Sequence, residues 1–68
     1  MLQELDTRAA DGITVTLYWD GTFQRTLIRL VDQRSATDET FEVPAPSAAD
    51  AFEHPFYYLN SAVSFAVS

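Results

Sequence analysis

Residues 13–32 read ITVTLYWDGTFQRTLIRLVD, and this stretch decides the fold of the chain. Residues 13–20 alternate between apolar and polar side chains, which is the pattern of a strand with one buried face. Residues 25–33 alternate in the same way, and the Asp20-Gly21 pair between the two runs is a strong turn signal. The stretch therefore predicts an antiparallel hairpin of two half-buried strands.

The register of this hairpin follows from its apolar face, because a slip of one residue would turn that face to water. A tight two-residue turn would waste part of the apolar face, so we expect a four-residue loop over residues 20–23. This loop pairs Val15 with Ile28 on the apolar face. On the opposite face it pairs Tyr18 with Arg25.

A third strand at residues 39–43 extends the hairpin, so that residues 12–43 form a three-stranded antiparallel β-meander. The apolar face of such a sheet needs a cover. A helical segment over residues 47–62 supplies it, with Ser47 as the N-cap and an interruption near Pro55. The predicted fold class is α+β, a three-stranded antiparallel β-meander with a C-terminal helix packed on one face.

The two ends of the chain carry weaker patterns. Residues 1–11 are an N-terminal arm or a short helix, because their apolar residues recur at helical spacing, and Asp11-Gly12 closes them with a turn. Residues 60–68 fit a helix, a strand or disorder, and we assign 63–68 to a tail. At 68 residues the chain has room for a single small domain.

Composition excludes several classes of function. Ten carboxylates oppose four arginines and no lysine, and the resulting charge of −6 repels nucleic-acid phosphates and anionic membranes. Without cysteine there is neither a disulfide nor a thiolate zinc site. The sequence also has no apolar run long enough to span a membrane and no signal-peptide pattern, so we expect a cytoplasmic protein that binds neither nucleic acid nor membrane.

Catalytic signals are weak. Asp50 and His54 lie four residues apart on the predicted helix, where they would share a cation or form an ordinary surface pair; we favour the surface pair. No serine lies in a nucleophile-elbow motif, and two glycines make no phosphate-binding loop. We therefore predict no enzyme activity, no cofactor and no metal site.

Two groups of residues are candidates for an interface with a protein partner or a second copy. The first lies on the sheet face that the helix leaves uncovered: Tyr18, Arg25, Leu27, Arg29 and Val31. Tyrosine, arginine and aliphatic residues are typical of interfaces. The alternative is that the arginines pair with Glu42 or another carboxylate across the sheet.

The second group is Tyr57 and Tyr58, in an aromatic stretch larger than one small sheet can cover. Either some of these rings meet a second subunit, or they finish the core and the tyrosine hydroxyls stay in water. Small domains often gain stability by oligomerising, so a homodimer is the expected state.

Three segments resemble a group of small acidic actinobacterial proteins of unknown function. The matching stretches are DGITVTLYW at residues 11–19, FEV at 41–43 and DAFEHPFYY at 50–58. The resemblance covers roughly residues 4–59 and implies no catalytic residues.

The function predicted from the sequence is that of a small non-catalytic interaction or regulatory protein that self-associates. The alternative is an acidic nucleic-acid mimic, in which the carboxylates at Asp38, Glu39 and Glu42 imitate phosphates and block a basic protein. A solvated acidic rim explains the same residues without any partner.

Overall fold

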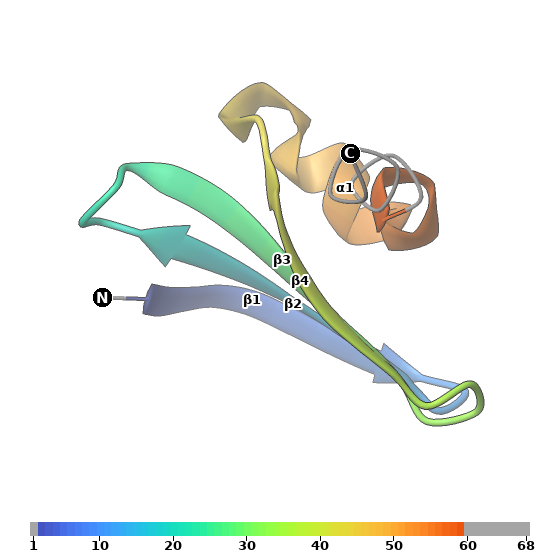
Figure 1. Cartoon of the computed structure of the whole chain (residues 1–68). Helices are drawn as coiled ribbons and strands as arrows, with labels where there is room; N and C mark the ends of the chain where they lie inside the picture. The colour runs from blue at the N-terminus through green and yellow to red at the C-terminus, as the bar shows by residue number, and fades with distance from the viewer. Residues whose placement is uncertain (1, 60–68) are drawn as a thin grey trace, which may run out of the picture.

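The computed structural model describes residues 2–59 of the chain. They form an antiparallel sheet of four strands in the order β1-β2-β3-β4, with short helices on one of its faces (Figure 1). The elements are β1 (Leu2–Ala10), β2 (Ile13–Asp20), β3 (Arg25–Asp32), β4 (Thr37–Val43), the 3-10 turn η1 (Ala45–Ser47) and α1 (Ala48–Glu53). The α+β class and the antiparallel sheet are confirmed.

The predicted number of three strands is wrong, because residues 2–10 form the strand β1 and not a helix or an arm. All nine of its residues are exposed, so β1 has no buried face that an apolar pattern could reveal. Its signal is the turn that follows it. Asp11 and Gly12 both have positive φ, 56° and 80°, as the tight turn of a two-residue hairpin requires.

The β2–β3 hairpin has the predicted faces but a register two residues away from the predicted one. Val15 pairs with Leu30, where we expected Ile28. The loop has four residues as predicted, but it spans 21–24, and Gln24 adopts a φ of 53° to close it. A shift of two residues keeps every side chain on its own face.

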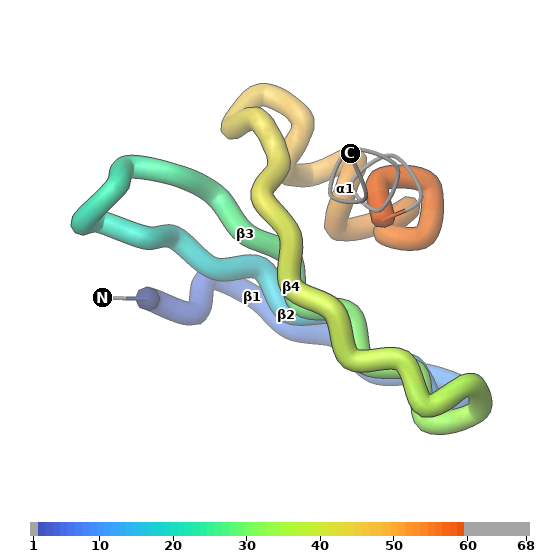
Figure 2. The backbone as a smooth tube through the Cα atoms, in the orientation of Figure 1, coloured from blue at the N-terminus to red at the C-terminus, as the bar shows by residue number. Residues whose placement is uncertain are grey.

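The core lies between the sheet and α1. Among the described residues, six buried side chains form it: Val15, Ile28, Leu30, Phe41, Val43 and Ala51. Ala51 comes from α1, so this helix covers the face of the sheet from which the other five side chains project. The two ends of the sheet differ, because the β1–β2 and β3–β4 turns lie together at one end and the β2–β3 loop at the other (Figure 2).

The helical cover is interrupted where proline predicts it. After α1 ends at Glu53, the chain is helical again over residues 55–59, so the break falls at His54, directly before Pro55. Ser47 occupies the N-cap position but makes no capping hydrogen bond through its side chain. Residues 60–68, for which the sequence left helix, strand and disorder open, lie outside the described residues. Within residues 2–59 no helix is long and apolar enough to cross a membrane.

Candidate protein interface

The side of the sheet opposite α1 is the candidate site, and we call it the open face. Residues that pair across antiparallel strands project on the same side of a sheet. By the observed pairing, the open face carries Leu2, Glu4, Thr7, Ala9, Thr14, Thr16, Tyr18, Asp20, Arg25, Leu27, Arg29, Val31, Asp38, Thr40 and Glu42. All five sheet residues of the first predicted group are therefore on one surface.

Arg29 is held on the open face by Asp38 of the neighbouring strand β4. Its Nε and Nη2 atoms donate to the two carboxylate oxygens of Asp38 at 3.0 and 2.8 Å. This two-pronged hydrogen bond lowers the pKa of Asp38 and, together with the Asp38 charge, raises the pKa of Arg29. The predicted alternative, pairing with a carboxylate across the sheet, is confirmed for this arginine.

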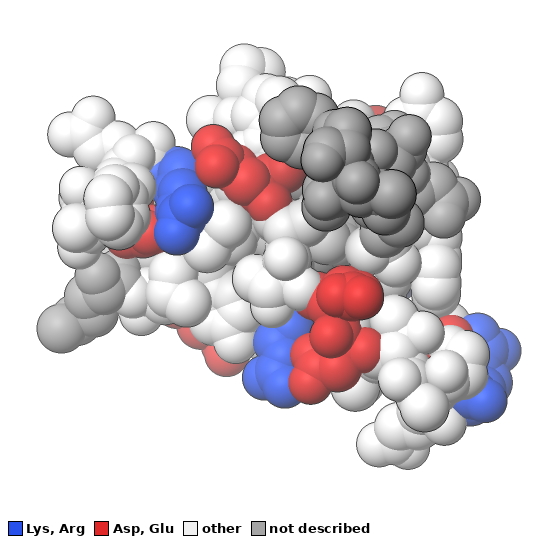
Figure 3. All heavy atoms as spheres, viewed as in Figure 1, with Lys and Arg blue, Asp and Glu red and all other residues white. Residues whose placement is uncertain are grey.

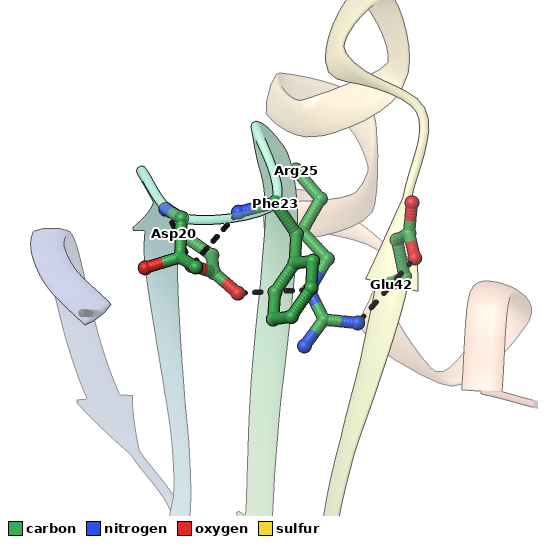
Figure 4. A network of polar contacts seen from close by, with 5 residues as sticks. Asp20, Phe23, Arg25 and Glu42 are labelled. Atoms are coloured by element: carbon green, nitrogen blue, oxygen red, sulfur yellow. Dashed lines mark hydrogen bonds and ion pairs between the residues drawn. The ribbon is translucent and has the colours of Figure 1, made fainter.

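Arg25 belongs to a larger cluster around the buried carboxylate of Asp20 (Figure 4). Asp20 accepts hydrogen bonds from Arg25 Nε at 2.9 Å and from the backbone amide of Thr22 at 3.0 Å. Burial raises the pKa of Asp20, but these hydrogen bonds outweigh it, so the pKa lies below its usual value. Arg25 also reaches Glu42 on β4 at 3.9 Å. The cluster fixes the shape of the β2–β3 loop.

Phe23 is a site residue that the sequence reasoning missed. It lies at the tip of the β2–β3 loop and is 71% exposed, with its ring 5.1 Å from the Arg25 guanidinium (Figure 4). The backbone amide of Phe23 donates to Asp20 at 3.4 Å, which helps to hold the loop. A large aromatic residue directly after Gly21-Thr22 in a predicted turn was the available signal, because turns seldom need a phenyl ring.

The aliphatic residues of the open face are less accessible than predicted. Leu27 is only 7% exposed, because its neighbours within the chain already cover it, and Val31 is half-buried. Tyr18, which pairs with Leu27, is also half-buried. Phe23 and Leu2 are exposed large apolar residues on this side, both at the end of the sheet that carries the β2–β3 loop.

The two predicted tyrosines lie on the other side of the sheet, in the helical segment, so the structure does not bring them together with Tyr18. The Tyr58 hydroxyl donates to Asp50 Oδ2 at 2.7 Å, and this hydrogen bond raises its pKa. Tyr57 packs edge to face on Tyr58 and is 69% exposed. Tyr58 therefore serves the helical cover, whereas Tyr57 remains accessible.

The Asp50–His54 pair expected on the helix does not form through side chains. The Asp50 carboxylate receives the Tyr58 hydroxyl, and His54 contacts Asp50 only through its backbone amide, at 2.8 Å from the carbonyl oxygen. Among residues 2–59 no three metal-ligating side chains come together.

A hollow of about 280 Å³ lies between β1 and the helical segment. Its lining is Arg8, Ala9, Ala10, Asp11, Ile13, Val15, Glu53, Pro55 and Phe56. The guanidinium of Arg8 is already used for contacts within the protein, because it donates to the backbone carbonyls of Phe52 and Glu53 at 2.8 to 3.2 Å. Among residues 2–59 the lining brings no hydroxyl, thiol or imidazole next to a base.

Each of the four arginines is therefore engaged with a neighbour. Arg34 completes the set, because its backbone amide and guanidinium both donate to the buried Asp32, at 2.9 and 3.2 Å, which lowers the pKa of that carboxyl. Basic side chains accordingly lie directly against acidic ones on the visible surface (Figure 3). The basic residues stabilise strands and loops of this small domain.

Comparison with known proteins adds no relative. No family model matches the chain, and neither a curated protein nor a solved structure is significantly similar to it. The resemblance to small actinobacterial proteins therefore stays a prediction.

Proposed function

We propose that this protein is a small non-catalytic interaction module that associates with a second copy of itself through the open face. The observation that carries the proposal is the difference between the two sides of the sheet. One side is covered by α1, whereas no described element covers the other. On that uncovered side the Phe23 ring and the Arg25 guanidinium already contact each other. A rigid aromatic side chain beside an arginine is typical of interface anchors.

The size of the open face suits a weak dimer. Strands of about eight residues at roughly 3.3 Å per residue, four strands wide at about 4.8 Å, give a face of about 500 Å². Two such faces would bury about 1,000 Å², which lies at the lower limit for specific protein interfaces. For a weak dimer of this kind, the dimer fraction rises as the protein concentration increases and falls on dilution.

The charges of the open face also suit a second copy. Arg25 and Arg29 each lie beside a carboxylate of β4, so basic and acidic groups alternate across the surface. When two such faces stack, an arginine of one copy has carboxylates of the other within reach. A strongly basic partner would bind this face less favourably, because the arginines on it would repel the partner's positive charges.

The nucleic-acid mimic is the weaker proposal for the same reason. Of its three predicted carboxylates, Asp38 is bound by Arg29 and Glu42 lies near Arg25. Neutralised carboxylates imitate phosphates poorly. A mimic would bind a basic protein with an affinity that falls steeply as salt rises, whereas the homodimer depends mainly on contact between the faces.

Sedimentation equilibrium of the full chain over a range of concentrations tests the proposal. We expect a monomer–dimer equilibrium with a dissociation constant on the order of 10–100 µM, as for small interfaces with few anchors. Phe23→Ser and Tyr18→Ser should each weaken it about tenfold or more. Tyr57→Ser is the matched control, because it removes an exposed aromatic ring from the other side of the molecule and should leave the constant unchanged.

Two results would overturn the proposal. One is a monomer at every concentration up to about 1 mM, well above the constant expected for an interface of this size. The other is a dimer that Tyr57→Ser weakens and Phe23→Ser does not, because the helical side would then form the interface.

A further inference from the structure

The outer edge of β1 is a second surface with binding potential, separate from the open face. In a two-residue hairpin the residues that flank the turn form a hydrogen-bonded pair. Here that pair is Ala10 and Ile13. Because hydrogen bonding alternates along an antiparallel strand, Arg8 bonds to β2, whereas the backbone groups of Thr7 and Ala9 point outward, away from the sheet.

An outward-facing edge of this length is a template for another strand. β1 has nine residues with neither proline nor lysine, the residues that usually discourage pairing at an edge. Its two leucines, Leu2 and Leu5, are about half exposed. The opposite edge, β4, is better protected, because it carries three carboxylates and is followed by Pro44.

The β1 sequence fits a second copy of itself. If two β1 strands pair in antiparallel fashion about Thr7, the Thr7 residues face each other as a hydrogen-bonded pair, since both point outward. The same alignment places Asp6 of each copy opposite Arg8 of the other. In this alignment no like charges face each other, so charge repulsion does not by itself prevent the pairing.

The central donor of that pairing is already occupied. The Asp6 carboxylate accepts a hydrogen bond from the Thr7 backbone amide at 2.8 Å. The Thr7 hydroxyl is turned inward, 3.2 Å from the Val15 carbonyl oxygen and 3.1 Å from the Thr16 hydroxyl. The register also shifts between Glu4 and Asp6, which bends the strand at the same place.

We propose that Asp6 guards the β1 edge: its carboxylate caps the outward amide of Thr7 and so prevents β1 of one copy from pairing with β1 of another. The guard is local, because it consists of one side chain and one backbone amide. The proposal does not depend on the proposed function, since it concerns another surface.

Substitutions at Asp6 separate capping from charge. In Asp6→Ala the Thr7 amide is free, and we expect a new association, at least tenfold tighter than in the parent. Asp6→Asn loses the charge but keeps an oxygen acceptor at the same place, so it should behave like the parent. Glu4→Ala removes a charge from the same strand without uncapping an amide and is the second control.

Sedimentation equilibrium should be carried out in the Phe23→Ser background, so that the result does not depend on the open face. Hydrogen exchange by NMR provides the second readout, and the Ala9 amide should become protected only in the Asp6→Ala variant. These substitutions change exposed side chains of a strand with no buried residue, so the fold is retained.

Two outcomes would overturn the proposal that Asp6 protects the β1 edge. One is an Asp6→Ala variant that associates no more than the parent. The other is equal association of Asp6→Ala, Asp6→Asn and Glu4→Ala, because charge alone would then account for the effect.

Discussion

β1 and β3 both pair with β2 along most of its length, yet they are strands for different reasons. β3 buries five of its eight residues, including Ile28 and Leu30 with no exposed surface. β1 buries none of its nine. β3 is therefore stabilised by packing against α1 and the neighbouring strands, whereas β1 is stabilised by backbone pairing, by its turn and by the contact of Arg8 with α1.

The largest effect should come from deleting a side chain in β3. Ile28→Ala removes a fully buried side chain from the centre of the core, and we expect a loss of about 2–5 kcal/mol in the free energy of unfolding. Leu5→Ala in β1 is the matched deletion. Leu5 is 51% exposed, so its loss should cost less than about 0.5 kcal/mol.

Urea unfolding followed by circular dichroism measures both variants. If Ile28→Ala does not fold, Ile28→Val should still cost about 0.5–1.5 kcal/mol. Equal losses for Leu5→Ala and Ile28→Ala would contradict the comparison, because β1 would then be buried like β3.

The turn that creates β1 should give the next largest effect. Gly12→Ala places a side chain at a φ of 80° and should cost about 1–2 kcal/mol. The new Cβ would lie 3.5 Å from Arg34 Cγ, an ordinary contact, so the cost comes from the backbone. Gly21→Ala is the control. Its φ is not in the left-handed region and its Cβ has room beside Trp19, so the urea midpoint should barely change.

Arg8 contacts α1 from β1. Substituting it should lower the free energy of unfolding by less than Gly12→Ala does. Arg8→Lys keeps the charge but loses the forked guanidinium that donates to Phe52 and Glu53 and lies over the Phe52 ring. We expect a loss of about 1 kcal/mol, since these hydrogen bonds are exposed. The measurement is urea unfolding, and an unchanged midpoint would show that α1 does not hold β1.

The smallest effect concerns the exposed pair of Arg29 and Asp38 between β3 and β4. The pKa of Asp38 is lowered on folding, so its contribution to stability is complete above the unfolded value of about 3.8 and is lost as the pH falls through the lower folded value. Asp38→Asn should flatten the decrease of the urea midpoint in acid and change little at pH 7. Glu4→Gln on β1, which removes a carboxylate outside the described ion pairs, is the control. If the urea midpoint of Asp38→Asn decreased in acid as steeply as that of the parent, the Asp38 pKa would not contribute to the acid dependence of stability.

The comparison also shows how far the sequence could predict the molecule. β2, β3 and β4 followed from alternating apolar residues, because these strands bury one face. The helical cover followed from Ser47 as a candidate N-cap, from the break expected at Pro55 and from the need to cover the apolar face. β1 was not predicted, because a strand with no buried residue leaves no hydrophobic pattern in the sequence. The available signal was the Asp11-Gly12 turn, but a turn alone does not show that the residues before it form a strand. The register differed by two residues because a Gln24 with positive φ was not foreseen.

The candidate site was predictable to a similar degree. Alternation placed Tyr18, Leu27 and Arg29 on one surface, since side-chain direction in a strand follows from residue number. Exposure could not be predicted in this way, because it depends on neighbours across strands. Leu27 is therefore covered, whereas Phe23, in a loop without periodicity, is the exposed anchor.

An NMR dilution series of the ¹⁵N-labelled full chain tests the central claim, that the protein self-associates through the open face and not through the β1 edge. We predict that amide shifts which change with concentration cluster at Phe23, Arg25 and Tyr18, while the outward-pointing amide of Ala9 stays unprotected against hydrogen exchange at every concentration. Changes at Thr7 and Ala9 without changes at Phe23, or no changes at any concentration up to about 1 mM, would contradict the account.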